Sequence, residues 1–253
     1  MRTEKDAFRR SMYDKEQLSM KVLCNATYGF CGADGKGALL AVRTVMYLVT
    51  SIGRYLQKQS SHHLAEYYGI PTIYGDTDSV FVHVDHRPPE QQQLPHDAEQ
   101  VTAYVQHRYG LNIPGRSPGE APTWPDVVAW YRLRHGLDVA AMDPAHQVNA
   151  VLYLVYHKLC AEVSALFRPD IVLEMENMSD NVWMSDKKKH YCYRMWNPSN
   201  PSCVYKTKIT GMAAKKREYT PWTREVLLSL TDRLLQGKDS TVRHTKGVIV
   251  PVV

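Results

Sequence analysis

The sequence predicts an α+β fold in which an antiparallel β-sheet is backed by long helices. Residues 70–74 and 80–84 are short β-rich segments on either side of a polar centre at 75–79, which is the pattern of a β-hairpin. The segments before this hairpin have the apolar spacing of helices, and further β-rich segments follow it between 182 and 209. The hairpin is therefore the centre of the expected fold.

Two helices are expected before the hairpin. Residues 1–30 read as helical, with an apolar series at Leu18, Val22 and Leu23, and the glycines that follow predict a loop. Residues 38–68 have a wide apolar face, which indicates a core helix that supports the sheet. Gly69 and Pro71 are expected to end it.

The chain after the hairpin alternates between an insertion, a helix and strands. Residues 85–147 contain eight of the fourteen prolines and predict an inserted subdomain or loop, with one helix at 127–135. A helix is expected at 148–167 and a strand at 171–176, where alternation places Glu174 and Glu176 on one face. The segments expected after these are strands at 182–184, 191–196 and 203–209, and a helix at 222–235.

Composition excludes several classes of protein. The chain has 253 residues, 44% of them hydrophobic, which is enough for a sizeable core, and it has no apolar run of membrane-spanning length and no apolar signal-peptide core. Its five cysteines have neither a disulfide-framework spacing nor a CxxC pair. They predict free thiols in a reducing compartment and argue against a zinc site.

Positive charge is concentrated in one stretch. Residues 187–217 contain nine of the 31 Lys and Arg and no Asp or Glu, whereas the rest of the chain has the remaining 22 against 26 acids. Such a stretch suits a surface that neutralises phosphates, although a basic run can also be a solvated face.

Two carboxylates occupy the hairpin centre. Asp76 and Asp78 are two residues apart, so a strand would place them on one face. Carboxylates that close repel each other unless a cation lies between them, and hard oxygen ligands suit Mg²⁺ or Mn²⁺. The alternative is an ordinary turn, in which Gly and Asp are common.

Three short motifs resemble those of the family B DNA polymerases. Residues 74–79, Tyr-Gly-Asp-Thr-Asp-Ser, resemble the palm metal motif called motif C. Residues 21–29, from Lys21 to Gly29, resemble motif B on the fingers helix, and residues 188–191, Lys-Lys-His-Tyr, resemble the Lys-Lys-x-Tyr motif. Residues 211–217 resemble the start of the thumb. The motifs lie in the family's order, and the sequence around motif B is most similar to that of the polymerases of herpesvirus-like large DNA viruses.

The resemblance implies a two-metal catalytic site. Asp76 and Asp78 are then the catalytic carboxylates, with Asp78 the main metal ligand and Asp76 next to it. Glu174 corresponds to a family position near the metals, and the expected cofactor is a pair of Mg²⁺ ions, with Mn²⁺ as the alternative.

The resemblance also implies where substrates bind. Lys21, Asn25 and Tyr28 are spaced i, i+4, i+7 on one helical stripe, and in the family this stripe contacts the incoming deoxynucleoside triphosphate. Thr210 stands where many relatives have Lys, so one duplex contact is expected to be weaker. The residues expected to hold primer-template DNA are Lys188, Lys189 and Tyr191, with Lys215, Lys216 and Arg217 nearer the thumb.

On this reading the chain is an internal fragment of a DNA-directed DNA polymerase of an intracellular, reducing compartment, the host nucleus for a herpesvirus-like source. It has no stretch like the family's Asp-bearing first motif, so the fragment alone is expected to be inactive. A processivity factor is a further suggested partner, and no membrane is expected. The implied parts are the end of the fingers at 1–37, the palm helix and hairpin at 38–84, the insertion at 85–147, the rest of the palm at 148–209, and the start of the thumb at 210–253.

Two other functions remain open. A non-catalytic nucleic-acid-binding module, including a degenerate polymerase, would use the basic stretch without the metal site. An unrelated metal-dependent phosphohydrolase would use the Asp pair but not the Lys21 stripe.

Overall fold

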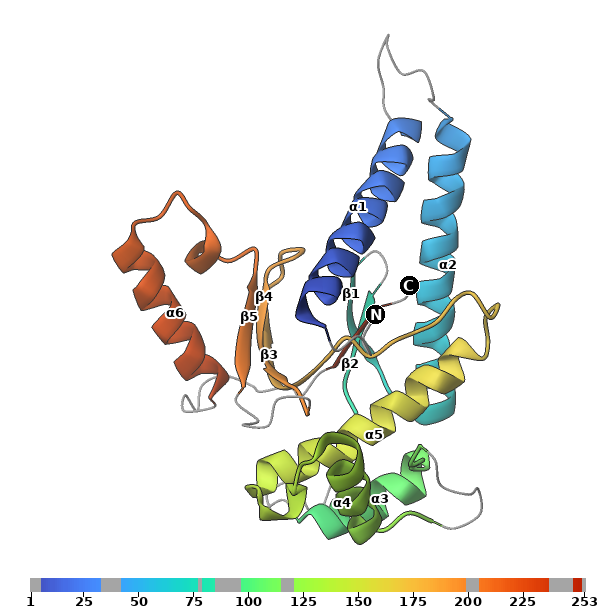
Figure 1. Cartoon of the computed structure of the whole chain (residues 1–253), viewed down its shortest axis with the longest axis vertical. Helices are drawn as coiled ribbons and strands as arrows, with labels where there is room; N and C mark the ends of the chain where they lie inside the picture. Colours follow the sequence, from blue (N-terminus) through green and yellow to red (C-terminus); the bar gives the residue numbers. More distant parts are fainter. Residues whose placement is uncertain are drawn as a thin grey trace. The chain divides into compact units, whose positions relative to one another are not determined.

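The computed structural model describes residues 6–32, 42–76, 79–84, 97–114, 121–198, 205–236 and 248–251. The chain divides into two compact units, Met1–Tyr55 and Leu56–Val253. Long helices and an antiparallel sheet together confirm the predicted α+β class (Figure 1).

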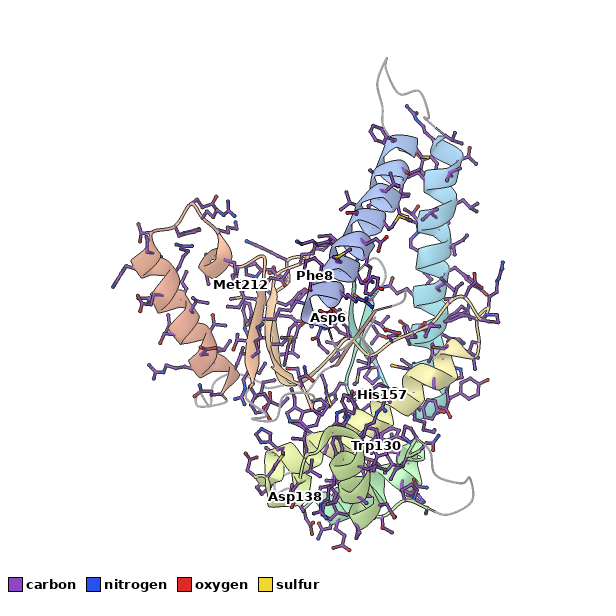
Figure 2. The ribbon with its side chains drawn as sticks, viewed as in Figure 1. Asp6, Phe8, Trp130, Asp138, His157 and Met212 are labelled. Carbon is purple, nitrogen blue, oxygen red and sulfur yellow. The ribbon has the colours of Figure 1, made fainter. Side chains whose placement is uncertain are left out.

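The first unit is helical. Helix α1 spans Ala7–Cys31 and begins where the Asp6 side chain accepts hydrogen bonds from the backbone N–H groups of Phe8 and Arg9, an N-cap that satisfies otherwise unpaired donors (Figure 2). It ends at Gly32, where a Cβ would collide with the side chain of Met46 on helix α2. The predicted N-terminal helix is confirmed.

Helix α2 spans Arg43–Tyr68, close to its predicted bounds, but the expectation of a core helix holds for only part of it. Its buried residues are Ser60 and Leu64, both in the second half, whereas Leu48 and Ile52 in the first half are 58% and 45% exposed. A wide apolar face is buried only where another element covers it. The described α2 residues that join the main hydrophobic cluster, Leu56, Leu64 and Tyr68, all lie in the second half.

The second unit is built on a six-stranded sheet with the order β1-β2-β6-β3-β4-β5. Strands β1 (Thr72–Asp76) and β2 (Ser79–Val82) form the predicted antiparallel hairpin. Strands β3 (Asn177–Met184), β4 (Tyr191–Trp196) and β5 (Lys206–Thr210) confirm the predicted meander.

Two parts of this sheet differ from the prediction. Residues 171–176 do not form a strand: only Leu173 makes an isolated bridge, and the regular strand begins at Asn177. Strand β6 (Val248–Pro251), which the sequence left unplaced, pairs antiparallel with both β2 and β3 and so joins the hairpin to the meander. Its partners come from distant segments, and no local pattern specifies them.

The proline-rich insertion is a folded helical region where the structure describes it. Helix α3 spans Ala98–Tyr109, helix α4 spans Trp124–His135, and the 3-10 turn η2 spans Val139–Ala141. Helix α4 starts with a capping box between Thr123 and Asp126 and ends at Gly136, which has a left-handed conformation (φ 66°). The helix expected at 127–135 is therefore confirmed.

Helix α5 (Pro144–Ser164) joins the insertion to the sheet and replaces the predicted helix at 148–167 with slightly earlier bounds. Residues from α2, β2, α3, α4 and α5 share one buried hydrophobic cluster, which also includes Met178 of β3 and Trp196 of β4. Figure 1 shows α3 and α4 gathered around one end of α5. The insertion thus contributes to the main core of the second unit.

Helix α6 (Pro221–Leu235) follows the 3-10 turn η3 (Ala213–Lys215) and confirms the last predicted helix. It packs on β4 and β5 through a small cluster of Cys192, Ile209, Ala214 and Leu235. The described cysteines, Cys24, Cys31, Cys160 and Cys192, are unpaired, as expected, and Cys203 lies outside the described residues. In the described part of the chain, every helix is too short or too polar to span a membrane.

Candidate functional site

The hairpin presents Asp76 at its turn. Asp76 pairs with Ser79 at the end of the β1–β2 ladder, and the Ser79 hydroxyl donates to the Asp76 carbonyl oxygen at 3.1 Å. The Asp76 side chain is only 14% exposed. Asp78, the predicted main metal ligand, lies with Thr77 outside the described residues.

A glutamine of α2 holds the same turn. The Gln57 Nε2 atom donates to the Ser79 carbonyl oxygen at 3.0 Å. The amide passes so close to Gly75 that a Cβ there would collide with it. A side chain at position 75 would therefore displace the Gln57 amide from its contact with Ser79. Sequence reasoning missed Gln57, because nothing in the helix pattern distinguishes it from other polar residues of α2.

The turn between β3 and β4 brings two lysines to the hairpin. The Nζ atoms of Lys188 and Lys189 lie 3.7 and 3.5 Å from the two carboxylate oxygens of Asp76. The backbone N–H of Lys189 also donates to the Tyr74 hydroxyl at 3.0 Å. The structure thus brings together Asp76 and the Lys-Lys pair, which were predicted separately as metal-site and DNA-binding residues.

Two unusual backbone features shape this lysine turn. Lys189 has a positive φ of 57°, and Gly211, just after β5, has a φ of 70°. A Cβ at Gly211 would collide with the Lys189 carbonyl oxygen, so only glycine fits beside the turn. The start of the predicted thumb motif therefore supports the geometry of the Lys-Lys pair.

An aromatic cluster of Tyr74, Phe81, Tyr191 and Tyr193 lies behind these charges. The Tyr191 ring centroid is 5.8 Å from that of Tyr74 and 5.2 Å from that of Phe81. Tyr193 is fully buried, and its pKa is raised first by burial and then by the nearby Glu176 carboxylate. The predicted DNA-binding Tyr191 is thus fixed to the hairpin by ring contacts.

The strand register places this cluster on one side of the sheet. Tyr191 lies opposite Thr210, Tyr193 opposite Lys208, and Met195 opposite Lys206. Directly opposed residues in an antiparallel pair point to the same side. We call this side, with Tyr191, Tyr193 and Met195 of β4 and Thr210, Lys208 and Lys206 of β5, the aromatic face.

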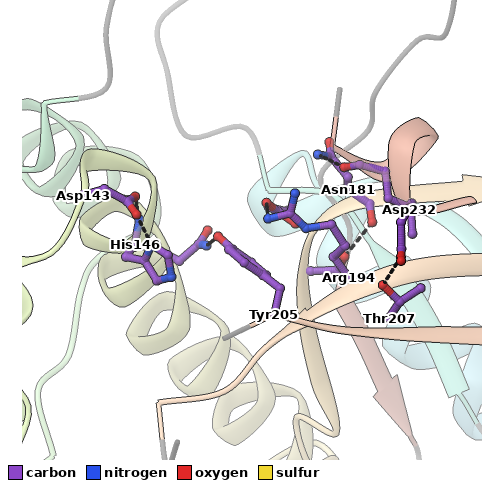
Figure 3. A network of polar contacts seen from close by, with 11 residues as sticks. Asp143, His146, Asn181, Arg194, Tyr205, Thr207 and Asp232 are labelled. Atoms are coloured by element: carbon purple, nitrogen blue, oxygen red, sulfur yellow. Dashed lines mark hydrogen bonds and ion pairs between the residues drawn. The ribbon is translucent and has the colours of Figure 1, made fainter. Parts of the chain in front are cut away.

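The other side of β4 is occupied by an internal polar network (Figure 3). Arg194 lies 3.3 Å from an Asp180 oxygen and stacks on the Tyr205 ring with its guanidinium carbon 3.9 Å from the centroid. The Tyr205 hydroxyl accepts from Asn149 of α5 at 2.8 Å. Arg194, one of the nine bases of the basic stretch, is therefore engaged within the protein.

The two glutamates after α5 have different surroundings. Glu174 is exposed, and its charge affects two residues of α5. Burial raises the pKa of Cys160 to about 12, and the Glu174 carboxylate adds to this rise. Burial lowers the pKa of His157, and the Glu174 carboxylate opposes this effect. Glu176 instead pairs with Lys208 at 3.7 Å. The role of Glu174 near a metal stays a prediction.

The remaining predicted residues lie elsewhere. Lys21, Asn25 and Tyr28 are exposed on α1, in the first compact unit, at the helical spacing that was predicted. Lys215, Lys216 and Arg217 are exposed at η3 and just after it, and Lys216 pairs with Glu218 at 3.6 Å. Their predicted ligands stay predictions.

Across the described residues, no group of three or more His, Cys, Asp or Glu side chains could hold a metal ion. The two lysine ammonium groups beside Asp76 supply the positive charge that a nearby carboxylate needs. Asp78 lies outside the described residues, so the metal-binding roles of Asp76 and Asp78 stay predictions.

The family model and the similar proteins found by comparison all describe DNA polymerases. The model of DNA polymerase family B matches residues 1–113, which include the Lys21 stripe and the hairpin. The DNA polymerase of Paramecium bursaria Chlorella virus NY2A is 25% identical over 244 residues, which are 96% of this chain and 20% of that protein. The DNA polymerase catalytic subunit of Gallid herpesvirus 2 is 38% identical over 28% of this chain and 8% of its own length. DNA polymerase 1 of Sulfurisphaera ohwakuensis is 36% identical over 41% of this chain and 11% of its own length. The chain thus spans a fifth or less of these relatives.

Proposed function

We propose that this chain is part of a family B DNA polymerase, a DNA-directed DNA polymerase that adds deoxynucleotides to a primer 3′ end; the match of residues 1–113 to the family model and the similarity to viral DNA polymerases support this. The observation that supports this most is the pairing of Asp76 with Lys188 and Lys189. It brings a carboxylate turn and a basic turn to one place, as a reaction at a phosphodiester backbone requires. The similarity to viral polymerases supports replication of a viral DNA genome.

The residues of motif C and motif B have distinct roles in this proposal. Asp78 would hold the catalytic Mg²⁺ ions, which would stabilise charge on the attacking and leaving oxygens. Asp76 lies beside that position and orients the lysine turn. Lys21 contacts the triphosphate, and Asn25 and Tyr28 face the nucleotide.

The basic residues bind the primer-template duplex. Lys188 and Lys189 are 72% and 60% exposed, so their ammonium groups can reach a phosphate while staying near Asp76. Lys215, Lys216 and Arg217 bind backbone phosphates further along. Phosphate contacts of this kind position the duplex without reading its sequence.

The test is Asp78→Ala in the whole protein. Loss of a metal ligand costs several kcal/mol of transition-state stabilisation, so we expect primer extension to be abolished while duplex binding stays nearly intact. Asp170→Ala, at an exposed residue paired with Arg168, is the matched control and should leave extension unchanged. Extension by Asp78→Ala within about tenfold of wild type would contradict the proposal, since a lost ligand costs more than that. A wild-type protein that binds duplex without extending primers would favour the non-catalytic binding module.

A further inference from the structure

One lysine of the basic stretch lies on the aromatic face but outside the Lys-Lys turn. The Lys208 Nζ atom is 5.8 Å from the Tyr193 ring centroid, and the side chain is 44% exposed. Tyr193 stacks on Tyr191 at 6.1 Å, and Tyr191 contacts the hairpin. Lys208 is therefore linked to the candidate site through the rings of Tyr193 and Tyr191, one strand further from it.

Lys208 can exchange its ion-pair partner, Glu176, for another anion. Glu176 Oε1 lies 3.7 Å from its Nζ atom, and the Glu176 side chain is 49% exposed. Ion pairs this open to solvent contribute little to stability. A phosphate offers Lys208 an equivalent anionic acceptor, and duplex backbone presents phosphates at close intervals. Arg194, on the other side of β4, has no such freedom because Asp180 and Tyr205 fix it.

On the basis of the proposed function, we propose that Lys208 is a further phosphate contact for duplex nucleic acid, and that Glu176 competes with phosphate for it in the free protein. The ligand is the phosphodiester backbone, so the contact is independent of base sequence. Binding moves the Lys208 ammonium group from the carboxylate to a phosphate, which makes Glu176 a restraint on duplex affinity.

The test is a set of duplex titrations at several salt concentrations, in which the fluorescence anisotropy of a labelled DNA measures binding. Lys208→Ala should weaken binding and flatten the slope of log affinity against log salt by about 0.9, the contribution of one phosphate contact. Glu176→Gln should tighten binding by about two- to fivefold, because the exposed pair no longer has to open. In the Lys208→Ala background the same change should have less effect, since the two residues are coupled.

Three comparisons make the outcome decisive. Lys58→Ala removes one exposed lysine from α2 and should leave the slope unchanged. An unchanged slope in Lys208→Ala, an equal change in Lys58→Ala, or an equal gain from Glu176→Gln with and without Lys208 would overturn the inference. The Lys188→Ala/Lys189→Ala variant tests the proposed function separately. If it flattens the slope and Lys208→Ala does not, only the inference fails; if wild type binds no duplex, the proposed function fails.

Discussion

Asp76 is the residue at which the hairpin and the lysine turn meet. Its carboxylate has two ammonium neighbours from a segment more than a hundred residues later in the chain. The sequence motifs identify both partners as functional, but they do not predict the contact, because it depends on how the β1–β2 hairpin and the β3–β4 turn are aligned in one sheet.

Gln57 has a similar supporting position at the turn of the hairpin. Its amide reaches the Ser79 carbonyl oxygen only because Gly75 has no side chain. The glycine of the Tyr-Gly-Asp motif is therefore explained by a helix residue that the motif does not contain. The sequence identifies Gly75 as part of the motif, but it does not show that Gln57 is its neighbour.

This arrangement predicts a coupled effect of two substitutions. Gly75→Ala should displace the Gln57 amide and cost about 1 kcal/mol of unfolding free energy, the value of one hydrogen bond. In a Gln57→Ala background the amide is already absent, so the same change should cost much less. Urea titrations of the four proteins measure both values.

The matched control is Gly136→Ala. Gly136 has a left-handed conformation with open space around it, so alanine there should be destabilising in either background. Equal costs of Gly75→Ala with and without Gln57 would contradict the contact.

At the scale of elements, local patterns located most helices and strands. Apolar spacing indicated α1 and α2, Gly69 and Pro71 marked the end of α2, and β-rich segments around polar turns indicated the hairpin and the meander. The strand expected at 171–176 was wrong, because apolar, β-prone residues form a strand only where a neighbouring strand offers them a ladder. β6 was missed for the converse reason: its ladder comes from distant strands.

The insertion is the element whose contribution was least visible in the sequence. Its prolines indicated a loop or subdomain, yet Tyr131 of α4 is fully buried in the main cluster, and its hydroxyl donates to the Ala150 carbonyl oxygen of α5 at 3.0 Å. Prolines mark where helices cannot continue, but they do not show whether the helices between them pack on the rest of the protein.

The packing of α4 can be tested at Tyr131. Tyr131→Ala should cost about 3–5 kcal/mol of unfolding free energy, the usual cost of truncating a buried aromatic residue. Tyr131→Phe should cost only about 1 kcal/mol, because it removes one hydrogen bond and keeps the ring. Leu133→Ala is the control on the same helix: Leu133 is 90% exposed, so its loss should stay within about 0.5 kcal/mol. Similar values at both positions would mean that α4 does not pack as described.

At the scale of the whole molecule, charge and sheet geometry act together. The sequence showed that positive charge is concentrated at 187–217, but it could not show which bases are available to a ligand. The structure separates them: Arg194 is engaged internally, whereas Lys188, Lys189 and Lys208 lie near the hairpin and on the aromatic face. A solvated basic face and a phosphate-binding face have the same composition and differ only in this arrangement.

The two interpretations of the basic stretch make different predictions for Lys188→Ala/Lys189→Ala. If both lysines touch phosphate, each releases counterions, so the double change should weaken binding to every duplex and flatten the salt slope by roughly 2. Arg54→Ala/Lys58→Ala removes the same charge from exposed positions of α2 and should leave the slope nearly constant. Titration of each variant against two duplexes of unrelated sequence measures both the slope and the independence from sequence. An unchanged slope for Lys188→Ala/Lys189→Ala would identify a solvated face, and the duplex would have to bind elsewhere on the protein.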